Sequence, residues 1–425
     1  MEKIELNNDK LRNTKCNLDG DPKIGWLRNK NGLLLKTYAW IVKNPIGNIL
    51  LIHGFKAHTR LIFMRINLKM PDNNEDLVVD TNNYYIYKDS WIEKFNQNGY
   101  SVYALDLQGH GESQALENLR GDINCFDDLV DDVIQYMNHI QDNTSNDKQK
   151  GDECHNIVTN KKKRLPMYII GHSMGANIAL RILQLLGEEK EYRIKARSSN
   201  NYKNDNTMLN NSTNINENEN DMNNFNDYGS DNYCASISTT KNAIASDKDE
   251  GFYNYLDKLN IKGCVSLSGM MRLKTTWNAG NNSFKYLYLP VFNFLSLVAP
   301  DTRISSSSYK QSDYVTNVYK HDKLRNSNGA KFKCMYEVVK ATVTLNCNIN
   351  YIPKDIPLLF VHSKDDTVCC YNGSALFYDK ANVNKKELHT VDGMNHAITI
   401  EPGNEDILKK IIDWISDVRS NDEDK

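Results

Sequence analysis

The chain has no run of about 18 apolar residues, the length that a membrane-spanning helix needs. Its first 20 residues, MEKIELNNDKLRNTKCNLDG, contain no apolar core typical of a signal peptide. The formal net charge is only −2 over 425 residues, which gives no general attraction to nucleic acid. We therefore expect a cytoplasmic protein that has no nucleic-acid partner and at most peripheral contact with membranes.

Clusters of metal-ligating residues are also missing. The nine cysteines are an odd number, and Cys369 and Cys370 are adjacent, which favours reduced thiols over a disulfide framework. No cysteine stands with histidines at the spacing of a zinc site. We expect neither a metal nor another cofactor.

Polar residues are concentrated in insertions. Residues 198–250 are dominated by Asn, Asp and Ser, and such a segment buries too little apolar surface to offset its ordering entropy. We expect a disordered insertion there and a smaller one over about 141–164. The basic end of the smaller one, 161–164, is interpreted as a solvated loop end rather than a nuclear-import or lipid-binding patch. We expect a third insertion, over about 64–86, to form a surface hairpin.

Strands and helices alternate through the rest of the chain. Short, continuous apolar runs that end in Gly, Ser or Asp indicate strands buried on both faces of a parallel sheet, at 47–54, 100–111, 165–173, 261–269 and 356–366. Apolar residues at helical spacing predict helices over 123–140, 176–195 and 405–418. The pattern predicts an α/β fold, a mostly parallel sheet flanked by helices.

The same pattern suggests the domain organisation. An α/β core is expected over 23–269 and 356–418, between an N-terminal tail at 1–22 and a C-terminal tail at 419–425. Residues 270–355 carry no sheet pattern, and we expect them to form a helical cap before the strand at 356–366.

The stretch GHSMG, residues 171–175, follows a predicted strand and precedes a predicted helix. This is the context of a nucleophilic serine on a tight turn, whereas G-x-S-x-G alone also occurs in ordinary turns. Later strand ends supply Asp366 and then His396, the order of a serine–acid–histidine triad. We expect Ser173 as nucleophile, His396 as base and Asp366 as the acid, with Asp365 as the alternative acid.

A tetrahedral intermediate also needs two backbone N–H donors for its oxyanion. Met174 follows the serine at the start of the helix, and Phe55 follows the His53-Gly54 turn at an earlier strand end. We predict that these two amides form the oxyanion hole, and that His53 and His172 orient the loops around it.

Five segments together resemble the α/β-hydrolase superfamily: LLIHGFKAH, YALDLQGHGES, YIIGHSMGA, LLFVHSKDD and DGMNHAI. Within it the chain resembles the monoglyceride lipase and lysophospholipase branch, in particular the lysophospholipase-like proteins of malaria parasites, which share the asparagine-rich insertions. The resemblance implies the same triad and oxyanion donors. The usual H-G-x-x-D strand end reads HSKDD here, so counting from His362 selects Asp366.

The expected cap contains an apolar stretch, FKYLYLPVFNFLSLVAP, at 284–300. It predicts either ordinary cap core or an acyl-chain tunnel whose rim touches membrane, with Phe292, Phe294 and Leu295 as candidate substrate-binding residues. The leading hypothesis is a serine hydrolase that cleaves lysophospholipids or monoacylglycerols through an acyl-enzyme. The alternatives are a carboxylesterase for small soluble esters, an acyltransferase, or an inactive receptor that uses the same pocket.

Overall fold

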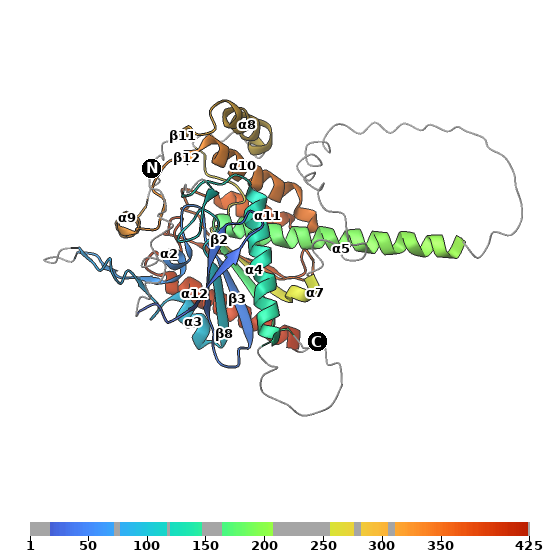
Figure 1. The fold of residues 1–425 in the computed structure, drawn as a ribbon, viewed down its shortest axis with the longest axis horizontal. Helices are drawn as coiled ribbons and strands as arrows, with labels where there is room; N and C mark the ends of the chain where they lie inside the picture. The colour runs from blue at the N-terminus through green and yellow to red at the C-terminus, as the bar shows by residue number, and fades with distance from the viewer. Residues whose placement is uncertain are drawn as a thin grey trace, which may run out of the picture.

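The computed structural model describes residues 18–71, 77–116, 120–146, 164–206, 256–275, 282–304 and 311–423. Its centre is one eight-stranded sheet (Figure 1). In spatial order the strands are β1 (Lys23–Arg28), β2 (Leu34–Trp40), β8 (Tyr100–Leu105), β3 (Gly47–Ile52), β9 (Met167–His172), β10 (Ile261–Leu267), β13 (Leu358–Ser363) and β14 (Lys386–Val391). From β8 to β14 all neighbours are parallel, and only the β1–β2 and β2–β8 pairs are antiparallel. The predicted α/β class with a mostly parallel sheet is confirmed.

The central strands are apolar and completely buried because helices cover both faces of the sheet. One face packs against α4 (Phe126–Asn146), α5 (Met174–Asn206) and α11 (Tyr371–Lys380). The other face packs against α2 (Thr59–Phe63), α3 (Trp91–Gln97) and α12 (Asn404–Glu423). The short α7 (Leu256–Leu259) precedes β10. In the part of the chain that the structure describes, every helix is too short or too polar to cross a membrane.

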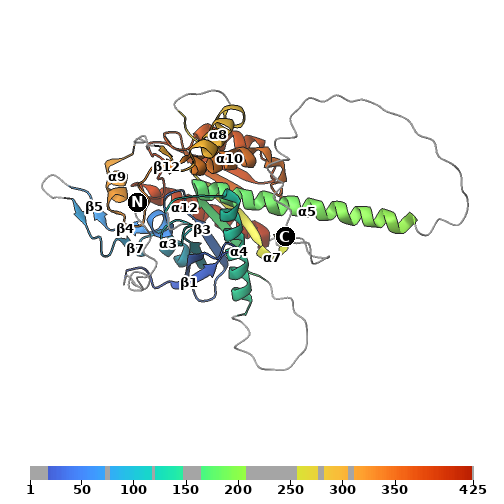
Figure 2. The ribbon, with the colours of Figure 1, turned by 45° about the horizontal axis from the view of Figure 1, so that its top comes forward.

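The described residues between β10 and β13 lie outside the sheet, most of them in a helical layer above it (Figures 1 and 2). It contains the π-helix η3 (Phe284–Tyr288), α8 (Leu289–Val298), β11 (Arg303–Ile304), α9 (Asp313–His321), β12 (Ala330–Lys331), α10 (Phe332–Cys347) and the 3-10 helix η4 (Ile349–Tyr351). Phe284 and Leu289 pack against Val339 and Val343 of α10 in a small core of their own. We refer to residues 282–347 as the cap.

The insertion at 64–86 is a two-part hairpin. β4 (Arg65–Ile66) pairs with β7 (Tyr85–Ile86), and β5 (Leu68–Lys69) pairs with β6 (Val78–Val79). Its base is packed rather than free, because Tyr84 donates from its hydroxyl to the carbonyl of Val318 in α9. The hairpin therefore ties the core to the cap.

Several predicted boundaries differ from the structure. Helix α4 continues to Asn146 and α5 to Asn206, so both extend into the segments expected to be disordered, whose remaining residues lie almost wholly outside the described ranges. Helix α12 continues to Glu423, past the last core contact at Val418, because no helix breaker follows. Residues 18–22 pack on the body, where the Asp19 carbonyl accepts from the Trp40 indole at 2.9 Å.

A buried carboxylate on α4 gives a prediction about stability. Asp132 is 1% exposed, accepts from the Asn29 amide at 3.2 Å, and burial raises its pKa to about 7. A raised carboxyl pKa makes the folded state less stable as pH rises from about 4 to 7, because the unfolded chain ionises first. Asp132→Asn keeps an acceptor for Asn29 and should raise Tm by a few degrees at pH 8 and hardly at pH 4. Thermal melts at both pH values check this, and equal shifts at both would contradict it.

Candidate active site

Ser173 lies on a strained turn between β9 and α5. Its φ is 55°, in the left-handed region that residues other than glycine rarely adopt. The two flanking glycines are required by close backbone contact. A Cβ on Gly171 would collide with the Gly175 carbonyl, and one on Gly175 would collide with the Ile52 carbonyl. The turn thus holds the Ser173 hydroxyl at the carboxyl end of the sheet.

The structure brings Ser173, His396 and Asp366 together in one hydrogen-bonded chain. His396 Nε2 lies 2.8 Å from Ser173 Oγ, and His396 Nδ1 lies 2.7 Å from Asp366 Oδ2. Ser173 is 7% exposed and Asp366 is 1% exposed. In this arrangement the imidazole can take the serine proton while the carboxylate fixes its tautomer.

The surroundings of Asp366 keep it ionised. Its Oδ1 accepts from the amides of Val368 and Cys369, both at 2.8 Å, and His362 Nε2 lies 3.2 Å from Oδ2. Burial alone would raise the pKa of Asp366, but His396 and His362 outweigh it and hold this pKa well below its ordinary value. His362 is a second imidazole on the carboxylate; in the sequence it served only as the start of the count to Asp366.

The alternative acid, Asp365, has a different place. Its side chain is exposed, and Oδ2 accepts from the Gly393 amide at 2.8 Å in the loop that carries His396. The same loop is held by Glu401, which accepts from the Asn395 amide at 3.0 Å. Burial raises the pKa of Glu401. Sequence reasoning missed Glu401, because a lone glutamate after a loop carries no recognisable signal.

The loop after β3 lies directly against the elbow. A Cβ on Gly54 would stand 3.0 Å from the Ser173 Cβ. In the described part of the chain neither the Phe55 nor the Met174 amide donates a hydrogen bond. Both amides thus retain a free N–H near the serine, as the predicted oxyanion hole requires.

Two buried histidines hold these loops. His53 Nε2 accepts from the Leu107 amide at 2.9 Å, so its Nδ1 carries the proton and donates to the Gly54 carbonyl at 2.8 Å. His172 Nε2 lies 3.1 Å from the His396 carbonyl. Burial lowers the pKa of each to about 3, so both imidazoles are neutral and act as fixed braces.

The three cap residues predicted to bind substrate do not share one environment. Phe292 is half-buried, lies 6.5 Å from the Phe332 ring, and packs on the small cap core. Leu295 is also half-buried, whereas Phe294 is 63% exposed. Phe294 therefore points to solvent and does not line an enclosed tunnel, because the helical turn places it on the face of α8 opposite to the cap core.

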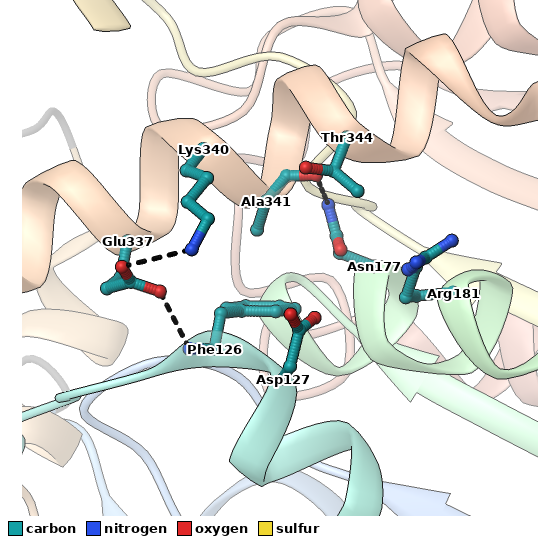
Figure 3. A pocket seen from close by; sticks show the side chains of 8 residues that line it. All are labelled: Phe126, Asp127, Asn177, Arg181, Glu337, Lys340, Ala341 and Thr344. Atoms are coloured by element: carbon teal, nitrogen blue, oxygen red, sulfur yellow. Dashed lines mark hydrogen bonds and ion pairs between the residues drawn. The ribbon is translucent and has the colours of Figure 1, made fainter. Parts of the chain in front are cut away.

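A small polar pocket lies between the cap and the core, beside the elbow helix (Figure 3). Glu337 of α10 accepts from the Phe126 amide at the start of α4, at 2.9 Å, and Asn177 of α5 donates to the Ala341 carbonyl. Neither Ser173 nor His396 lines this pocket, so we assign it to cap–core packing and not to the reacting centre. Its lining residues are Phe126, Asp127, Asn177, Arg181, Glu337, Lys340, Ala341 and Thr344.

Comparison with known sequences agrees with this geometry. Residues 82–197 and 253–403, more than half of the chain, match the Hydrolase_4 family, described as "Serine aminopeptidase, S33". The chain belongs to this family. An abhydrolase domain-containing protein of Dictyostelium discoideum is 24% identical over 189 residues, which are 41% of this chain and 20% of that relative. The matched region is thus a fifth of the relative's length.

Solved structures share the fold of the Hydrolase_4 chain. A soluble variant of monoglyceride lipase from Saccharomyces cerevisiae, solved with a substrate analog, has a TM-score of 0.54 at 17% identity, over 94% of this chain and 95% of that one. A carboxyl esterase from Bacillus coagulans, solved with glycerol, has a TM-score of 0.53 at 15% identity, over 93% and 98%. At these identities the likeness establishes the fold, which is the one expected from the motifs.

Proposed function

We propose that this protein is a carboxylic ester hydrolase that cleaves single-chain lipids, either lysophospholipids or monoacylglycerols, through an acyl-enzyme on Ser173. The observation that carries the proposal is the continuous chain from Ser173 Oγ through His396 to the buried Asp366 carboxylate. The fold shared with a monoglyceride lipase and a carboxyl esterase supports the ester chemistry.

The reaction follows from the positions of these groups. His396 Nε2 takes the proton of Ser173 as Oγ attacks the ester carbonyl, and the new oxyanion accepts from the Phe55 and Met174 amides. His396 then gives the proton to the leaving alcohol, which breaks the ester bond and leaves the acyl group on Ser173. Water, deprotonated by His396, attacks this acyl-enzyme and releases the fatty acid. An alcohol in place of water at this step would give an acyltransferase.

The outer face of the cap supports a lipid substrate. Val291, Phe294, Leu297 and Val298 lie on one side of α8, and all four are exposed, Leu297 at 75%. A contiguous exposed apolar face on a cap helix is typical of contact with a lipid surface. We propose that this face, residues 291–298, rests on the membrane or micelle from which the substrate is taken.

This proposal gives a prediction for the exposed phenylalanine. Burial of a phenylalanine side chain contributes about 1.5–3 kcal/mol, so Phe294→Ser should weaken binding to lipid vesicles by roughly tenfold or more. Turnover of a dissolved short ester should stay the same, because Phe294 is remote from the ester carbonyl. The measurements are vesicle co-sedimentation and hydrolysis of 4-nitrophenyl butyrate.

Val78→Ser is the matched control, since Val78 is 57% exposed on the hairpin and outside the cap. It should leave vesicle binding unchanged. Equal vesicle binding of Phe294→Ser and the unmodified protein would contradict the proposed lipid-facing surface.

The function itself is tested on a panel of substrates with the purified protein. The panel contains a monoacylglycerol and a lysophospholipid with the same acyl chain, a short ester, and an aminoacyl anilide suggested by the family description. We expect kcat/KM to be highest for the lipids. Activity on the short ester alone would favour the carboxylesterase alternative, and activity on the anilide alone would overturn the ester assignment.

A further inference from the structure

Two cationic side chains lie together beside the loop that carries Phe55. Lys56 follows Phe55 directly, and its ammonium donates to the carbonyl of Asn328 in the cap. Arg303 donates from Nη1 to the next carbonyl along the chain, that of Gly329, at 2.7 Å. Carbonyls of consecutive residues are only a few ångströms apart, so the two cations are held close to each other.

A third cation comes from the same cap segment. Arg325 stands three residues before Asn328, and its guanidinium lies 4.1 Å from the centre of the Tyr319 ring. Burial lowers the pKa of Lys56, and the positive charges of Arg325 and Arg303 lower it further. The three side chains, which we call the cation cluster, therefore act on one another.

The cation cluster has no carboxylate in direct contact within the part of the chain that the structure describes, although the charge of Asp301 acts on Arg303. Among these residues, no ion pair joins Lys56, Arg303 or Arg325 to an acidic side chain. The acidic groups nearby have other partners, because Asp322 is bound to His58 and Asp301 to Lys331. Like charges held together without a directly paired counter-charge are unfavourable, so an anion from outside the chain would stabilise the arrangement.

The backbone at Lys56 is also strained. Its φ is 59°, in the left-handed region where glycine is the usual residue. The chain thus carries a long cationic side chain at a position where the backbone conformation favours glycine. Such outliers gather at functional sites, where the surrounding structure holds them in place.

The cation cluster includes a residue of the loop that lies against the Ser173 elbow. Lys56 is two residues after Gly54, whose backbone contacts the elbow. The pKa of Tyr319, the ring that Arg325 contacts, is raised, mainly by burial. The Arg325 charge opposes this rise, and the charges of Glu401, Asp322 and Asp366 add to it. The charges of Arg325 and of the triad acid Asp366 thus both act on Tyr319.

We infer that Lys56, Arg303 and Arg325 form a subsite for the phosphate group of a single-chain lipid, bound while its ester lies at Ser173. Guanidinium and ammonium groups are the side chains that bind phosphate oxygens most strongly. A glycerol headgroup offers no charge to these cations. The inference rests on the proposed function and decides between its two lipids, because it makes a phosphate-bearing lysophospholipid the preferred substrate over a monoacylglycerol.

The test compares two lipids with one acyl chain, a lysophosphatidic acid and a monoacylglycerol. The unmodified protein should have the higher kcat/KM on the phosphate-bearing lipid. Lys56→Gln, Arg325→Gln and Arg303→Gln should each lower the ratio of the two kcat/KM values by about tenfold or more. Lys56→Gly is a second variant at the strained position that suits its φ and removes the same charge, so a folding defect of Lys56→Gln does not obscure the result.

Lys323→Gln is the matched control, because Lys323 is an exposed lysine two residues from Arg325. It should leave the ratio unchanged. An equal loss on both lipids in the cluster variants would show a general effect on the oxyanion and overturn the subsite. So would an unchanged ratio.

Inorganic phosphate distinguishes a lipid headgroup from a free ion. We expect phosphate to inhibit hydrolysis of the lysophosphatidic acid competitively, and less so in Lys56→Gly. Stimulation of short-ester turnover by phosphate, with an unchanged lipid ratio, would identify a free-ion effector site and overturn the inference. If the protein hydrolyses short esters and neither lipid, the proposed function fails together with the subsite, whereas hydrolysis of both lipids at equal rates rejects the subsite alone.

Discussion

Ser173→Ala should lower hydrolysis of every ester by at least about a thousandfold and abolish covalent labelling by a fluorophosphonate. Ser173 Oγ is the only atom lost, and it lies 2.8 Å from the imidazole that would activate it. Alanine meets the same strain as serine at a φ of 55°, so the fold should persist. Activity and labelling are measured together with Tm.

Ser268→Ala is a matched control for this prediction. Ser268 is also a buried serine with a left-handed backbone, at a φ of 45°, and it follows the neighbouring strand β10. Its hydroxyl has no hydrogen-bond partner among the described residues. Ser268→Ala should keep activity within about threefold. No base in the described part of the chain contacts the Ser268 hydroxyl, so this serine is not activated as a nucleophile. Comparable losses in both variants would indicate a structural effect and reject Ser173 as nucleophile.

Much of the fold could be predicted because the parallel strands are buried on both faces. Burial on both faces leaves few polar residues in β3, β8, β9 and β13, and the apolar runs become visible without an alignment. The same strands end at one edge of the sheet. Functional residues at successive strand ends could therefore be expected to meet there.

The antiparallel strands β1 and β2 were not predicted, for a physical reason. β1 reads KIGWLR and has one exposed face, and β2 contains Lys36, a charge that hydropathy places outside the core. The structure buries Lys36 to 1% exposure and pairs its ammonium with Glu112 at 2.8 Å. A buried ion pair between residues 76 positions apart leaves no local pattern in the sequence.

Other tertiary contacts between the core and the cap could not be predicted from the sequence for the same reason. The Asp322 carboxylate of the cap lies 3.1 Å from His58 Nε2, and Tyr85 of the hairpin donates to the same carboxylate. These three residues come from three separate segments. The cation cluster likewise combines a loop of the core with two segments of the cap. No spacing rule connects such positions, whereas the triad itself follows a known order along the chain.

The sequence left two candidates for the acid of the triad, Asp366 and Asp365. From the structure we expect very different effects when each is substituted. Asp366→Asn should lower kcat by roughly four orders of magnitude, because an amide cannot hold the His396 tautomer or stabilise its positive charge. Asp365→Asn should cost less than about threefold. The amide introduced there keeps an oxygen that accepts from the Gly393 N–H, and the side chain is exposed.

The pair is a matched test, because the two substitutions are the same chemical change on adjacent residues. Kinetics with a dissolved short ester measure the chemistry without the contribution of lipid binding. Circular dichroism and Tm verify that both variants fold. Asp366 contacts both His396 and His362, and their charges hold its pKa far below the ordinary value. Equal losses, or a larger loss for Asp365→Asn, would contradict the assignment of Asp366 and move the acid of the triad to the exposed neighbour.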